Sequence, residues 1–172
     1  MVEEATLSVP LDYLGRRHVA IDIRSLCEHL DLLVGAQVAE VIMKHHEVRL
    51  GKDAVAEIRK QNTDATTNEI IGKLVEHLQV TGFGTVEAKL TESGRELEIT
   101  VKNPCVKKTD GSAKSFLFSH WCGALSAMVG GEFEVMHVVY DAQKDLMRGR
   151  IVPRPIPKAH AGQSQSRENG AP

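Results

Sequence analysis

One uncharged stretch limits the possible folds of this chain more than any other feature. Residues 115–131 (SFLFSHWCGALSAMVGG) carry no formal charge, and two glycines close the stretch. The pattern predicts an apolar helix that ends at these glycines and has small residues on one side: Gly123, Ala124, Ser126 and Ala127. A strand-like run, residues 132–140, follows. This unit is predicted to be the core of the domain, the wall of a pocket, or both.

The N-terminal half of the chain predicts amphipathic helices. From Asp22 onward apolar residues recur at three- and four-residue steps, which indicates one long helix in which Gly35 marks a bend or a close helix contact. We expect Gly51 to end this helix or the turn after it, and residues 53–60 to form a further short helix. Residues 69–80 (EIIGKLVEHLQV) predict another helix with one buried face.

Alternating apolar and polar residues predict four strands. Residues 85–90 and 96–102 are expected to form a hairpin with one solvated face, and residues 146–152 the last strand. In residues 133–140 both alternating sets are largely apolar, so this strand is expected to be central in its sheet or to meet a partner. The predicted fold is α+β, with the N-terminal helices and a later helix packed on a four-stranded antiparallel sheet.

Composition narrows the domain organisation and the class of protein. We expect one domain over residues 21–152, an N-terminal arm over residues 1–20 and a disordered Pro/Gly/Ser-rich tail over residues 153–172. A net charge of −2 and a pI near 6.4 give no electrostatic footprint for nucleic acid. Three cysteines without close spacing, no signal peptide pattern and no apolar run of membrane-spanning length predict a cytoplasmic protein.

His120, Trp121 and Cys122 are adjacent, and His137 follows in the next strand. Imidazole and thiolate groups are ligands for zinc or a haem iron, but neighbours on a helix point about 100° apart. His120 and Cys122 therefore cannot chelate one ion together. In the alternative reading Cys122 is a small buried hydrophobe, His120 bonds a carbonyl at the helix start, and His137 is a core histidine. Trp121 is either core or a lid over a ligand.

The remaining polar residues predict no catalytic set. Phosphate-binding loops and the common hydrolase, metalloprotease and redox motifs are absent from the sequence. Most carboxylates fall on faces expected to be solvated. His45 and His46 are expected at the end of the long helix, where they complement its dipole.

Several segments together resemble the 4-vinyl reductase-like domain, the small-molecule-binding branch of a fold shared with core subunits of the tethering complex TRAPP. They are EIIGKLVEHLQV running into GFGTVE, the strand end VKNP, FLFSHWCGALSAMVGG and the closing pair of strands. The resemblance covers about residues 22–152. It implies a ligand-binding module, commonly dimeric, whose relatives include sensors of phenols and other hydrocarbons. The implied apolar cavity has as candidate ligand-binding residues Cys105, His120, Trp121, Cys122, Met128, Phe133 and His137.

The chain departs from that family in two places. Many members carry a Glu and two cysteines that resemble a zinc site, and the corresponding positions here fall near Val138, Asp141 and Gly149. Cys105 stands about where the aromatic sensors have a tryptophan. The resemblance therefore implies a general apolar cavity, without a metal site or a transferred phenol pocket, and it leaves any cofactor unknown.

Three functions follow from these observations. The first is a module that binds an apolar, aromatic or tetrapyrrole-like ligand as a homodimeric sensor or carrier, with another protein reading out binding. The second is a non-catalytic adaptor that uses the sheet face and the N-terminal arm as interfaces. The third is an enzyme or metalloprotein that uses His120, Cys122 and His137.

Overall fold

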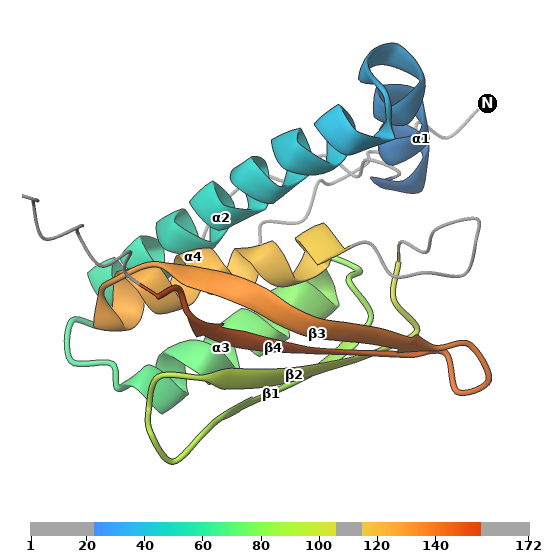
Figure 1. The fold of residues 1–172 in the computed structure, drawn as a ribbon. Helices are drawn as coiled ribbons and strands as arrows, with labels where there is room; N and C mark the ends of the chain where they lie inside the picture. Colours follow the sequence, from blue (N-terminus) through green and yellow to red (C-terminus); the bar gives the residue numbers. More distant parts are fainter. Residues whose placement is uncertain (1–22, 106–114, 156–172) are drawn as a thin grey trace, which may run out of the picture.

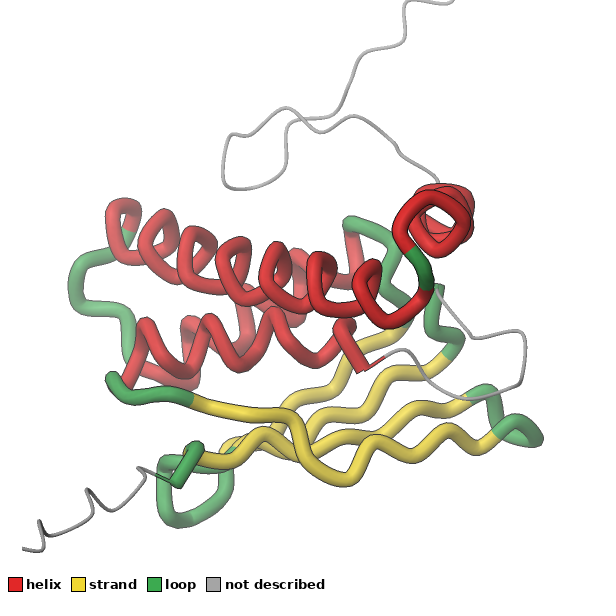
Figure 2. Tube along the Cα trace, turned by 45° about the horizontal axis from the view of Figure 1, so that its top comes forward, coloured by secondary structure: helices red, strands yellow, loops and turns green. Residues whose placement is uncertain are grey.

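The computed structural model describes residues 23–105 and 115–155 and shows an antiparallel sheet with helices on one face (Figures 1 and 2). The helices are α1 (Ile23–Val34), α2 (Ala36–Gln61), α3 (Thr67–Val80), a short 3-10 turn η1 (Ser115–Phe118) and α4 (Ser119–Val129). The strands are β1 (Thr85–Leu90), β2 (Leu97–Lys102), β3 (Phe133–Asp141) and β4 (Leu146–Pro153), in the order β1-β2-β4-β3. The predicted α+β fold is confirmed.

The two predicted terminal segments lie wholly or mostly outside the part of the chain that the structure describes. The predicted N-terminal arm, residues 1–20, lies outside the described residues, and so do residues 156–172 of the predicted tail. Within the described part, every helix is too short or too polar to cross a membrane.

Gly35 and Gly51 have roles that differ from the predicted ones. Gly35, at φ 81°, separates α1 from α2, so the predicted long helix is two helices. Gly51 was predicted to end the helix or the turn after it, and residues 53–60 to form a separate helix. Both predictions are wrong, because α2 runs through Gly51 without interruption to Gln61. The physical reason is packing: a Cβ on Gly51 would lie 1.9 Å from the backbone oxygen of His120.

The crossing of α2 and α4 is a contact between two backbones. Gly123 of α4 mirrors Gly51, since a Cβ there would lie 1.9 Å from the backbone oxygen of Val48. Real Cβ atoms do not approach other atoms so closely, so only glycine fits at either position. Gly123 thus allows α2 to approach α4 closely.

The helix α4 lies between α2 and the sheet, and α3 packs beside it against β1 (Figures 1 and 2). Its side chains Trp121 and Leu125 are fully buried, together with Phe116 of η1. The ring of Phe118 lies over Gly149 of β4, where a Cβ would come within 2.8 Å of it. Each such side chain contributes about 1.5–3 kcal/mol through burial, so the uncharged stretch forms part of the core.

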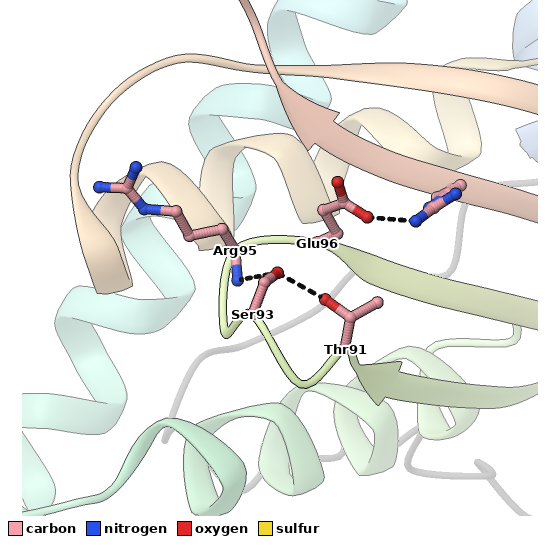
Figure 3. Close-up of polar contacts among 5 residues, drawn as sticks. Thr91, Ser93, Arg95 and Glu96 are labelled. Carbon is pink, nitrogen blue, oxygen red and sulfur yellow. Dashed lines mark hydrogen bonds and ion pairs between the residues drawn. The ribbon is translucent and has the colours of Figure 1, made fainter.

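The β1–β2 hairpin matches its prediction. The two strands pair from Thr85 opposite Lys102 to Leu90 opposite Leu97. In the turn the backbone N–H of Thr91 donates to the Glu96 carbonyl at 2.9 Å, and Ser93 Oγ lies 2.9 Å from Thr91 Oγ1 (Figure 3). Local hydrogen bonds of this kind fix the register of a hairpin.

The position of β3 differs from the predicted one. Of the two alternatives expected for this strand, the central position is wrong, because β3 is an edge strand that pairs only with β4 among the described strands. A partner across one face of the strand stays a prediction. The pairing shifts between Met136 and Val139, and His137 within this bulge has a φ of 55° and is exposed. Met136 and Val139 are 39% and 62% exposed, which explains why the strand looks apolar on both faces.

The two crossing glycines lead to a stability prediction. We expect Gly51→Ala or Gly123→Ala to lower the free energy of unfolding by about 3 kcal/mol or more, because the added methyl forces two packed backbones apart. The measurement is urea denaturation followed by circular dichroism. The control is Gly72→Ala on α3, where a Cβ meets nothing within 4 Å and alanine should add about 0.5–1 kcal/mol. Equal effects at Gly51 and Gly72 would contradict the proposed contact.

Candidate functional site

A surface hollow of about 400 Å³ lies between α2, α4 and the start of β3. One side of α2 forms its longest wall, through Val41, Lys44, His45, Val48 and Lys52. These residues repeat at three- and four-residue steps, so they share one face of the helix. The wall is therefore an apolar line, Val41 and Val48, flanked by cationic side chains.

The opposite side of the hollow comes from α4 and the ends of two strands. Cys122 and Ser126 of α4 meet Glu132, Phe133 and Arg154 there. The Ser126 hydroxyl donates to the Gly131 carbonyl at 2.7 Å, and Arg154 Nη1 lies 3.1 Å from Glu132 Oε2. These bonds hold the rim in place where the chain passes from α4 into β3.

The Cys122 thiol is buried in this wall, with the residue 5% exposed. Burial raises the pKa of the thiol from 9.0 to about 12, while the nearby Arg154 lowers it and Glu134 raises it by smaller amounts. The thiol is therefore protonated at neutral pH and offers an apolar, polarisable contact rather than a nucleophile.

Glu47 and His120 form a buried polar pair where α2 crosses α4. Each side chain is 4% exposed, and His120 Nδ1 lies 3.5 Å from Glu47 Oε2. None of these atoms, nor His120 Nε2, has a hydrogen-bond partner among the described residues. Buried polar groups without hydrogen bonds reduce stability, so this pair is a costly feature of the interior.

Of the seven residues predicted to bind a ligand, the structure brings Cys122 and Phe133 together at the hollow. Trp121 is 1% exposed and is part of the packed core, with its ring edge-on to His120 at a centroid distance of 6.5 Å. His120 was expected either at a ligand or bonded to a carbonyl, and it instead faces Glu47.

The other three candidates lie apart from the hollow's lining. Met128 and Cys105 are half-buried and pack against the core. The Met128 carbonyl accepts a hydrogen bond from Arg59 at 3.2 Å. His137 is not the core histidine expected from its apolar neighbours, because the bulge in β3 turns it to solvent.

A shared metal site of His120, Cys122 and His137 finds no geometric support. Within residues 23–105 and 115–155, no three His, Cys, Asp or Glu side chains gather closely enough to hold a metal ion. His120 is enclosed in the interior, and His137 lies exposed on the edge strand.

Sequence reasoning missed the cationic side of the hollow and the buried carboxylate. Lys44, Val48 and Lys52 recur every four residues, a signal that was available once α2 is seen to continue past Gly51. His45 was placed at a helix end, which is wrong for the same reason, because it lies in the middle of α2. Glu47 falls on the buried row of α2 between Met43 and Gly51.

Together these elements define a helix-covered, four-stranded antiparallel sheet, which is the fold class that the sequence predicted. The chain is similar to the phenol-responsive sensory domain of the transcription activator PoxR, whose crystal structure contains phenol. The TM-score is 0.64 with 11% sequence identity, over 81% of this chain and 78% of the sensory domain.

The chain also matches a vinyl-4-reductase family protein from Methanocaldococcus jannaschii, with a TM-score of 0.43 and 14% identity, over 82% of this chain and 100% of that protein. No family model matches the sequence, and no curated protein does. At these identities the similarity to the sensory domain establishes the fold of the chain.

The environment of Cys122 predicts how this thiol reacts. With a pKa near 12, Cys122 should resist alkylation by iodoacetamide at pH 8–9, because burial keeps it protonated and shielded. Half-buried Cys105 should react first. Peptide mass spectrometry after timed alkylation checks this, with the urea-unfolded protein as the control in which all three cysteines react. Rapid labelling of Cys122 in the folded protein would show that its burial is wrong.

Proposed function

We propose that this chain is a small-molecule-binding module for an apolar or aromatic ligand and works as a dimeric sensor or carrier. The observation that carries the proposal is the fold shared with a phenol-responsive sensory domain over 81% of the chain. The hollow supports it, since its volume of about 400 Å³ lies in the range of small-molecule sites. That volume favours a ligand of one or two rings over a tetrapyrrole.

The lining of the hollow supports binding rather than catalysis. Phe133 and Val48 offer apolar contact, and the protonated Cys122 thiol adds to it. A site that holds a ligand needs shape and a few polar groups, and this hollow has both. A nucleophile with an adjacent base is not found among its described lining residues.

The test of binding is direct. Denaturing extraction of freshly purified protein followed by mass spectrometry should release a small apolar or aromatic compound. Protein stripped in this way and refolded should bind the aromatic probe naphthol in calorimetric titration. Absence of any extracted compound together with absence of naphthol binding would overturn the proposed function.

Phe133 provides the matched variant for this site. We expect Phe133→Ala to weaken naphthol binding about tenfold, because the ligand loses an aromatic face worth roughly 1.4 kcal/mol. Met136→Ala is the control, since Met136 lies on the same strand, is 39% exposed and does not line the hollow. Titration calorimetry of both variants measures the effect. An equal loss of naphthol affinity in the two variants would show that naphthol does not bind in the hollow.

The dimeric part of the proposal rests on an exposed apolar surface, here named the α1/α2 patch. Seven of the eleven large hydrophobic side chains exposed among the described residues lie on α1 and the first two turns of α2, at the end of α2 away from the sheet (Figure 1). They are Leu26, Leu32, Leu33, Val34, Val38, Val41 and Ile42. Such a concentration is typical of an interface, and a second copy supplies the same surface by two-fold symmetry.

The dimer leads to a prediction about mass in solution. The wild type should elute as a dimer in size-exclusion chromatography with light scattering. Replacing both Leu32 and Leu33, 83% and 79% exposed, by Asp should give a folded monomer, because charges then face each other across the interface. The control is Val80→Asp on α3, 74% exposed and outside the patch, which should remain dimeric.

A monomeric wild type would overturn the dimer and favour the adaptor hypothesis, in which the patch binds another protein. The sheet face proposed for that adaptor gives it less support. Its outward side carries ion pairs such as Lys102 with Glu87 at 2.8 Å and Arg150 with Glu96, which favour contact with solvent.

A further inference from the structure

The hollow between α2, α4 and β3 is cationic. Lys44, Lys52 and Arg154 line it, against the single carboxylate of Glu132. A neutral hydrocarbon would form no ion pair with these cationic groups. Holding the cations beside an apolar surface is unfavourable unless an anion or water accompanies them. The charge of the lining therefore carries information about the ligand.

The three cations differ in how far they are already neutralised. Arg154 lies 3.1 Å from Glu132 Oε2 and 3.7 Å from Glu134 Oε2, so two carboxylates balance it. Its role is to fix the rim. It leaves little positive charge for a ligand.

The two α2 lysines that line the hollow, Lys44 and Lys52, are the charges available to a ligand. Lys44 has Glu40 at 3.5 Å, an i,i+4 contact between partly exposed side chains that contributes little and is readily exchanged for another anion. Lys52 forms no ion pair or hydrogen bond with any residue that the structure describes. The two lie two helical turns apart, on either side of Val48.

The surface between the lysines is apolar. Val48 lies between them along α2, and Phe133 and the protonated Cys122 thiol form the facing side. A ligand that satisfies both features carries a negative head group and an apolar body. The volume of about 400 Å³ admits an aromatic or medium-chain acid.

We propose that this hollow is a site for an organic carboxylate, whose anionic group pairs with Lys44 and Lys52 while its apolar body packs on Val48 and Phe133. The inference rests on the proposed small-molecule-binding function and specifies the class of its ligand. The lysines act as point charges here and accept a carboxylate without a fixed hydrogen-bond geometry.

The experiment compares an acid with its uncharged isostere on the full-length protein. Naphthoate should bind about tenfold more tightly than naphthamide in calorimetric titration at low salt, because only the acid pairs with the lysines. Raising the salt concentration should remove most of this difference, since the lysines are exposed and their charges are screened.

The variants locate the effect. Lys44→Gln combined with Lys52→Gln should lower the affinity for naphthoate about tenfold and change the affinity for naphthamide less than about twofold. Lys60→Gln is the control, because Lys60 lies on the same helix, is also exposed to solvent and does not line the hollow. Circular dichroism confirms that each variant is folded.

The outcomes separate the two proposals. Equal binding of naphthoate and naphthamide, or an acid preference that survives in the double variant, overturns the carboxylate site and leaves the small-molecule-binding function standing. Failure of naphthol, naphthoate and naphthamide alike, with no compound extracted from the purified protein, overturns both.

Discussion

The contact of two helix backbones at Gly51 and Gly123 determines the arrangement of the rest of the domain. It seats α2 directly on α4, and α4 in turn lies on the sheet, so the position of α2 relative to β3 follows from one crossing. The hollow is the space left between α2 and the start of β3, floored by α4. The shape of the hollow therefore depends on Gly51 and Gly123, which do not line it. A side chain at either glycine would push α2 away from α4.

The interior and the hollow divide the polar chemistry of the domain between them. The uncharged segment of residues 115–131 supplies part of the core, in which Trp121 is fully enclosed, and Glu47 and His120 form a buried polar pair at the crossing of α2 and α4. The hollow holds the exposed cations and the half-buried Phe133. This division separates the packed interior from the charged, solvent-facing lining of the hollow.

Much of the fold was predictable because its signals are local. The helix at residues 67–80 has a Thr66–Glu69 capping box and a regular apolar stripe, and the β1–β2 hairpin has strict alternation around a polar turn. The role of Gly51 was predicted wrongly because this glycine is required by contact with the backbone of His120, which is far away in the sequence. The edge position of β3 was also missed, since its apolar outer residues look the same in a buried strand and in an exposed one. Of the residues predicted to bind a ligand, only Cys122 and Phe133 lie together at the hollow. The lysines that line its other side were not predicted, because their common face depends on α2 continuing past Gly51.

The bulge at His137 has a consequence for how these molecules behave in a crowded solution. A long, flat border strand with exposed valine and methionine side chains is a template onto which a neighbouring chain can add its own strand. The irregular backbone at His137, at φ 55°, interrupts that template in the middle of β3. The bulge thus hinders edge-to-edge pairing of β3 with a strand of another molecule. A regular β3 without the bulge would pair with such a strand more readily and would favour aggregation.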